Sequence, residues 1–168
     1  MFADNIENFN TNNVIISDAI KNSMIEHSLF YKFLYSNEFV TFNGIFLYFQ
    51  LENINFNKDR IILTKDNENN LNVLNNIIDI EKKLFNIINS NKNKNYKLSE
   101  LINNNNIKFS KSDIDNINEF NEFNEFNEFN EFNKHHFILK LSGFWETNEN
   151  IGITFKIIKI NKFLDLKF

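Results

Sequence analysis

The segment that decides the fold is HFILKLSGFWETNENIGITFKIIKIN, residues 136–161. Two runs rich in β-branched and aromatic residues, at 136–147 and 151–161, flank the turn-forming residues Asn148, Glu149 and Asn150. This arrangement is typical of a β-hairpin. The end of the chain is therefore predicted to form two long antiparallel strands.

Strict alternation of side chains gives this hairpin one apolar and one mixed face. The apolar face carries Phe137, Leu139, Leu141, Trp145, Ile151, Ile153, Phe155 and Ile157. The mixed face carries His136, Ile138, Lys140, Ser142, Phe144, Gly152, Thr154, Lys156, Ile158 and Ile160. Trp145 is thus expected in the core. A face with lysines and an exposed ring suits a nucleic acid, since bases stack on rings and phosphates meet ammonium groups. An ordinary solvated sheet face has the same makeup, and Phe144 can also pack under a neighbouring strand.

Upstream, two aromatic-rich strands are predicted at 27–35 and 39–51, with a bend at Asn43-Gly44, and a third at 60–65. A helix capped by Asp66 or Asn67 follows, because apolar residues recur at helical spacing from residue 71 to 88. Shorter helical segments are expected at 14–24 and 98–102. The main order, β-β-β-α-β-β, predicts an α+β fold resembling the five-stranded oligonucleotide/oligosaccharide-binding (OB) barrel. A plain α+β sheet with one packed helix gives the same order.

One segment has a different composition from the rest: residues 118–132 are five copies of Asn-Glu-Phe. A period of three matches neither a helix nor a strand, so we expect residues 110–134 to be a disordered, low-complexity insertion. Residues 1–12 are expected to be disordered, and 13–168 to form a single domain. Residues 111–133 carry a net charge of −6, so the chain's total of −4 leaves +2 for the remainder. The folded part is therefore mildly basic. Asn makes up about a fifth of the chain, which points to an AT-rich gene.

The sequence offers little for catalysis. It has no cysteine, which excludes disulfides, thiolate zinc sites and thiol nucleophiles. Adjacent strand residues point to opposite faces, so His135 and His136 are not expected to share a metal. No Gly-rich phosphate loop or nucleophile elbow is present. We expect a protein that is not an enzyme and uses no cofactor or metal. The longest apolar run has five residues, 45–49, so an intracellular protein without a membrane segment is expected.

The candidate nucleic-acid-binding residues come from the closing hairpin and from the two predicted strands at 27–35 and 39–51. Lys140, Phe144 and Lys156 lie on the mixed face of the closing hairpin. Tyr31, Tyr48 and Lys32 in the first strands extend such a platform, but those strands are apolar on both faces, which also fits a core position.

The motif Leu-Lys-x-Ser-Gly-x-Trp-Glu-Thr, a polar turn and Gly-x-Thr-Phe-Lys, within residues 139–161, resembles a group of small proteins of nucleocytoplasmic large (giant) DNA viruses. The stretch FYKFLYSNEFVTFNGIFLYFQL, residues 30–51, is similar in layout to the same group. The hairpin also resembles the closing strands of single-stranded DNA-binding proteins of poxviruses and some phages. The resemblance implies a viral replication or virion protein, located in the host cytoplasm, its viral factory or the virion.

The predicted function is sequence-tolerant binding of single-stranded DNA in viral replication or repair, with single-stranded nucleic acid as the main partner and replication or virion proteins as further partners. The alternative is a structural or assembly protein of a virion, such as a minor capsid or scaffold component, that acts through protein–protein contacts.

Overall fold

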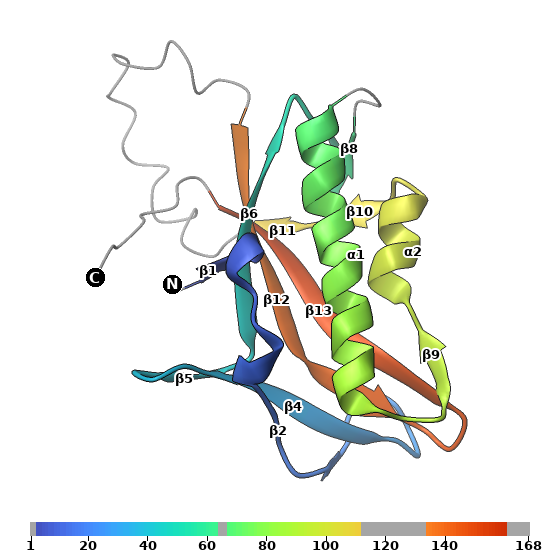
Figure 1. Cartoon of the computed structure of the whole chain (residues 1–168). Coiled ribbons are helices and arrows are strands. Elements are labelled where there is room, and N and C mark those ends of the chain that lie inside the picture. The colour runs from blue at the N-terminus through green and yellow to red at the C-terminus, as the bar shows by residue number, and fades with distance from the viewer. Residues whose placement is uncertain (1–2, 64–66, 112–133, 161–168) are drawn as a thin grey trace, which may run out of the picture.

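The chain folds as a β-sheet with two α-helices, α1 (Glu68–Ile88) and α2 (Lys97–Asn103), in the described part of this computed structural model, residues 3–63, 67–111 and 134–160. Figure 1 shows α1 lying along the sheet with α2 beside it. The strand order of the main sheet is an open path, so the described strands do not close into a barrel. The α+β class is confirmed, and the OB-like barrel is not.

The remaining elements are short or extended. Two 3-10 helices lie near the N-terminus, η1 (Ile6–Asn8) and η2 (Thr11–Asn13). The strands are β1 (Asp4–Asn5), β2 (Val14–Ile16), β3 (Ile20–Lys21), β4 (Leu29–Ser36), β5 (Thr41–Asn43), β6 (Ile45–Glu52), β7 (Asn55–Asn57), β8 (Arg60–Ile62), β9 (Asn93–Asn95), β10 (Ile107–Lys108), β11 (Ser110–Lys111), β12 (Lys134–Glu146) and β13 (Asn150–Ile160).

Strand β12 is the centre of the main sheet. One of its edges pairs antiparallel with β13, forming the predicted closing hairpin. Its other edge pairs first with β6, up to Leu141, and then with β4, from Gly143 onward. β1 adds in parallel to β6, while β9 and β11 add in parallel at the two ends of β13. Strands β7, β8 and β10 form a separate small sheet.

A β-bulge in β12 reverses the alternation of side chains between the two faces of the sheet. Odd-numbered side chains face the inner side before the bulge, and even-numbered ones after it. The register shifts between Leu141 and Gly143, so Ser142 has no partner residue on β13. Gly143 has φ +154, and a Cβ there would lie 2.0 Å from the Tyr31 carbonyl oxygen. Only glycine fits this position. Because one extra residue exchanges the two faces, Phe144 turns to the inner face, which packs on α1, and Trp145 to the outer face.

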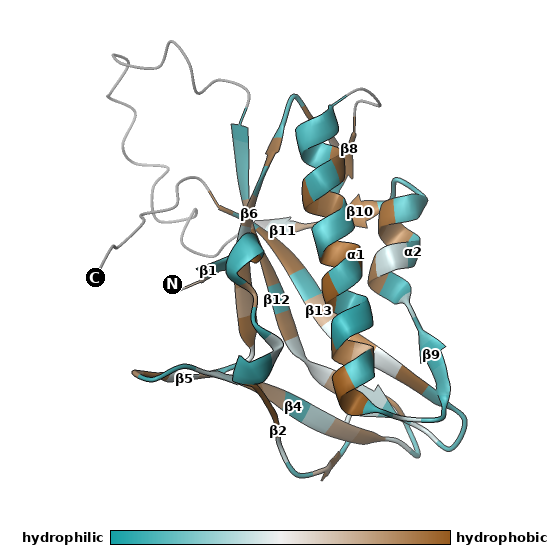
Figure 2. Cartoon of the chain, viewed as in Figure 1, coloured by the Kyte–Doolittle hydropathy of each residue, from teal (hydrophilic) through white to brown (hydrophobic). Residues whose placement is uncertain are grey.

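Helix α1 covers the inner face of the sheet. Asn67 caps its start by accepting a hydrogen bond from the Asn70 N–H, and Asn89 ends it in the left-handed conformation. Its hydrophobic positions recur among hydrophilic ones along the helix (Figure 2). The buried members pack into the main core: Leu74, Ile77, Ile80, Leu84 and Phe85. Each such side chain stabilises the fold by about 1.5–3 kcal/mol relative to exposure.

Two buried polar side chains of α1 hold neighbouring backbone. The Asn70 amide accepts from the Glu52 N–H at 2.8 Å and donates to the Glu52 carbonyl at 2.7 Å, as a paired strand would. The Glu81 carboxylate accepts from the N–H groups of Leu98 at 3.0 Å and Ser99 at 2.8 Å, and from the Ser99 hydroxyl. Glu81 thus caps α2, whose own N-cap residue makes no side-chain hydrogen bond.

Two predictions for the N-terminal region are wrong. Residues 14–24 contain no helix; they hold β2 and β3, both paired with β4. The β-branched residues Val14 and Ile15 pair with an edge of β4 that would otherwise be free, and the Ser17 hydroxyl accepts a hydrogen bond from the Lys32 N–H. Residues 3–12, expected to be disordered, form β1 and the 3-10 turns, with Ala3 and Ile6 buried.

The other main elements are confirmed. The predicted strands at 27–35, 39–51 and 60–65 correspond to β4, to β5 with β6, and to β8, with Gly44 at the bend between β5 and β6. The predicted helices at 66–88 and 98–102 correspond to α1 and α2. The short strands β7, β9 and β10 were not predicted. Of the predicted insertion 110–134, the structure describes only the two ends: residues 110–111, which form β11, and residue 134, at which β12 begins.

Candidate functional site

The outer face of the main sheet, on β4, β6, β12 and β13, is the face that α1 does not cover. All apolar residues that α1 buries belong to the inner core. The outer face has a small cluster of its own, formed by Ala3, Tyr48, Ile138 and Ile158 with Phe46 and Ile160 packed against it.

Two lysines oppose each other on this face. Lys140 of β12 is the direct cross-strand partner of Lys156 of β13, and Lys32 of β4 is the partner of Gly143. Lys156 and Lys32 are exposed, while the Lys140 Nζ lies 5.4 Å from the centre of the Phe46 ring. Among the described residues none of the three lysines forms an ion pair. Like charges placed directly opposite each other destabilise a sheet, so this pair favours a bound anion.

Trp145, the only tryptophan of the chain, lies on the same face. Its indole covers Gly152 of β13, where an added Cβ would come within 2.5 Å of Cζ2. Because Gly152 has no side chain, the ring can lie flat over the strand. Trp145 is half-buried, which leaves part of a flat aromatic surface accessible. We call Lys32, Phe46, Lys140, Trp145 and Lys156 the basic-aromatic patch.

Two of the six predicted site residues face the inner side instead. Phe144 is 4 % exposed and stacks on Tyr31 with ring centres 4.5 Å apart. The Tyr31 hydroxyl donates to Glu146 at 3.2 Å, and burial, followed by the Glu146 interaction, raises the pKa of this phenol. The prediction that Phe144 is exposed on the mixed face is wrong, because the bulge reverses the alternation, and the assignment of Trp145 to the core is wrong for the same reason.

Tyr48 lies on the outer face but is only 9 % exposed. Its hydroxyl lies 2.7 Å from His136 Nδ1 and accepts from the Gln50 amide, so it belongs to the small apolar cluster rather than to a stacking platform. Of the six predicted site residues, Lys32, Lys140 and Lys156 are therefore the ones that the structure places in the basic-aromatic patch. Sequence reasoning missed Trp145, for which the Ser-Gly pair before it was the available signal of a bulge.

The two adjacent histidines lie against different rings. His135 packs edge-on against Phe56, with centres 4.9 Å apart, whereas His136 stacks with Tyr48 at 5.9 Å. Burial lowers the pKa of His135 below its ordinary 6.5, and the charges of Lys159 and His136 add to the effect. Within the described ranges no three His, Asp or Glu residues are grouped so as to hold a metal ion.

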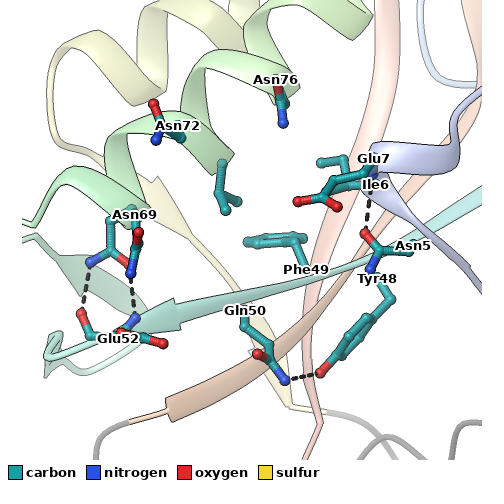
Figure 3. Close-up of a pocket in the computed structure, with 12 residues that line it drawn as sticks. Asn5, Ile6, Glu7, Tyr48, Phe49, Gln50, Glu52, Asn69, Asn72 and Asn76 are labelled. Carbon is teal, nitrogen blue, oxygen red and sulfur yellow. Dashed lines mark hydrogen bonds between the residues drawn. The ribbon is translucent and has the colours of Figure 1, made fainter.

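A pocket of about 390 Å³ opens at the edge of β6, between β1 with η1 and the N-terminal half of α1. Figure 3 shows Phe49 at its centre, with Asn72 and Asn76 on the helix side and Gln50 and Tyr48 on the sheet side. Side-chain amides dominate its rim. No sequence signal pointed to this pocket, since asparagine is common throughout the chain.

No protein-family model, curated protein or solved structure matches this chain. The resemblance to giant-virus proteins and to viral single-stranded DNA-binding proteins thus stays a prediction. Of the helices that the structure describes, none has the length and apolar character needed to cross a membrane.

Proposed function

We propose that the protein binds single-stranded nucleic acid on the outer face of its sheet, through the basic-aromatic patch. The observation that carries the proposal is the opposed pair Lys140 and Lys156 with two aromatic rings on the same face: Phe46, the partner of Lys140 on β6, and Trp145, further along β12. Phosphates would lie between the two ammonium groups and relieve their repulsion. Bases would stack on the accessible part of the indole, an interaction worth about 1–3 kcal/mol per base.

The patch favours single strands over duplexes. A duplex reader usually inserts a basic helix into the major groove. Helix α1 instead carries Glu68, Asp79 and Glu81 against Lys82 and Lys83, so it is slightly acidic. A sheet face with rings and lysines offers no element that projects into a DNA groove, but unpaired bases can stack on its rings whatever their sequence.

Fluorescence anisotropy with a labelled oligo(dT) of about 16 nucleotides tests the proposal. Three phosphate contacts predict a slope of log K against log salt of about −2. The double variant Lys140→Glu/Lys156→Glu should weaken binding about tenfold or more. The matched control, Lys82→Glu/Lys83→Glu, makes the same charge change on exposed positions of α1 and should retain more of the affinity. Absence of binding at low salt, or equal losses in both double variants, would refute the proposal.

An assembly role is the second candidate, favoured by two exposed apolar side chains. Met24 is 89 % and Phe39 87 % exposed, at the β3–β4 and β4–β5 connections. Such side chains are typical anchors of protein–protein contacts. Light scattering on the wild type and on Met24→Ser/Phe39→Ser distinguishes the two roles. Self-association that these changes abolish, together with absent oligonucleotide binding, favours assembly; a monomer that binds oligo(dT) favours the first proposal.

A further inference from the structure

The pocket at the edge of β6, which we call the edge pocket, occupies a gap in strand pairing. β1 pairs with β6 at Leu47 and Tyr48. The Asn70 amide takes the place of a strand at Glu52. Between these positions, no described strand pairs with β6 on this edge. The N–H and C=O of Glu52 both point to this edge, where they meet the Asn70 amide. Because the backbone groups of alternate strand residues point to the same edge, Gln50 also directs one donor and one acceptor there, into the pocket.

Apolar side chains and neutral amides form most of the walls of the edge pocket. Phe49, Ile6 and Val73 supply its apolar lining. Asn69, Asn72 and Asn76 line the helix side; they are exposed, and their spacing of three and four residues places them on one face of α1. Their amides can both donate and accept hydrogen bonds.

Charge excludes anionic ligands. The lining contains no lysine or arginine, and it includes the carboxylates of Glu7 and Glu52. Glu52 forms an ion pair with Lys134 at 3.3 Å, whereas Glu7, the other charged residue of the lining, forms no ion pair with any described residue. A phosphate would be repelled here, and the apolar side chains and neutral amides of the lining suit an uncharged group.

Geometry excludes a peptide strand. The gap offers one donor and acceptor pair, whereas strand addition needs a run of such pairs along an open edge. β1 and the Asn70 amide close the edge on either side. A small planar ring with an adjacent donor and acceptor meets these limits. The volume of about 390 Å³ lies at the small end of the range for small-molecule pockets.

We infer that the edge pocket takes one unpaired nucleobase, held by the Gln50 backbone and the amides of α1. This inference rests on the proposed function, because it places the base on a strand that lies on the outer face. The two sites share strand β6: Tyr48 and Gln50 line the pocket, and Phe46 of the patch precedes them on the same strand, where it pairs with Lys140 as Gln50 pairs with His136. All bases carry a donor and an acceptor side by side, so no base is preferred.

Uncharged nucleosides test the pocket separately from the patch. With ¹⁵N-labelled full-length protein, titration with thymidine or adenosine should shift the amide resonances of Gln50, Asn72 and Asn76. Asn72→Ala/Asn76→Ala should weaken this binding about tenfold. Asn75→Ala is the matched control, since Asn75 is exposed on the same helix and does not line the pocket. Val73→Phe, which fills the pocket, should abolish the shifts, and the asparagine variants keep the test valid if that protein does not fold.

The outcomes separate the two proposals. Nucleoside shifts confined to Trp145 and its neighbours, or shifts equal in the asparagine variants and the wild type, would overturn the edge-pocket inference and leave the patch intact. Nucleoside shifts in the pocket that persist in Lys140→Glu/Lys156→Glu, together with oligonucleotide affinity lost in that variant, support both. Oligonucleotide affinity that is indifferent to the lysines, with nucleosides still bound in the pocket, would refute the patch alone.

Discussion

Replacement of Gly143 by alanine perturbs the bulge on which the assignment of the two faces depends. The new Cβ would lie 2.0 Å from the Tyr31 carbonyl oxygen, and ordinary contact begins at 3.4 Å, so β4 must move away from β12 by about 1.4 Å. The obstacle is backbone, which cannot rotate aside. The residue would also keep φ +154, where a side chain is strained.

The expected cost follows from the pairing that is lost. Four residue pairs join β12 to β4, from Gly143 with Lys32 to Glu146 with Leu29. Weakening about three hydrogen bonds of about 1 kcal/mol each, plus about 1 kcal/mol of backbone strain, gives about 4 kcal/mol. This loss corresponds to a fall in Tm of about 8–16 °C for a protein of this size.

Gly152→Ala provides the matched control. Its Cβ would also meet an atom, Trp145 Cζ2, at 2.5 Å, but that atom belongs to a side chain that can swing away on the outer face. We expect a loss of about 1 kcal/mol or less. Urea unfolding, followed by the fluorescence of the only tryptophan and by circular dichroism, measures both variants. A Gly143→Ala protein within about 1 kcal/mol of the wild type, or equal losses in the two variants, would refute the reasoning.

Three further predictions concern single side chains. Phe144→Ala should lower the free energy of unfolding by about 3–5 kcal/mol, because it leaves a cavity in the core, whereas Trp145→Ala should cost less stability but more oligonucleotide affinity. Urea unfolding measures the stability and anisotropy the affinity, and the reverse pattern would contradict the bulge. Glu81→Ala should cost about 2–3 kcal/mol and speed hydrogen exchange at the Leu98 amide, since α2 loses its cap; unchanged exchange there would contradict this role. Because the pKa of His135 is lowered in the fold, the folded protein binds fewer protons than the unfolded chain, and the free energy of unfolding should fall as the pH drops below about 6.5. His135→Gln should reduce this dependence of stability on pH, and an equal dependence in both proteins would exclude His135 as its source.

Regular periodicity made much of the fold predictable. The closing hairpin and α1 are long segments whose apolar spacing agrees with one structure only, and tertiary contacts reinforce it. The segment 14–24 is short, and its apolar residues are compatible with either a helix or a strand. The free edge of β4 decided in favour of strands, and sequence alone does not show where such an edge lies.

The candidate site was predictable up to the bulge. Lys140 and Lys156 share a face because uninterrupted alternation holds for their part of the hairpin. Beyond Ser142 the same rule placed Phe144 and Trp145 on the wrong faces, because a single inserted residue reverses every later side chain. The edge pocket was not predictable, since it arises where β1 ends and the Asn70 amide takes over pairing.

Titration of the wild-type protein with unlabelled oligo(dT), monitored by Trp145 fluorescence over a salt series, tests the central claim most directly. We predict saturable quenching at low salt, because bases stack on the only indole of the chain. The affinity obtained from this quenching should fall with rising salt concentration by the same factor as the affinity obtained from anisotropy. Emission that stays constant while anisotropy reports binding would place the nucleic acid elsewhere on the molecule and contradict the account.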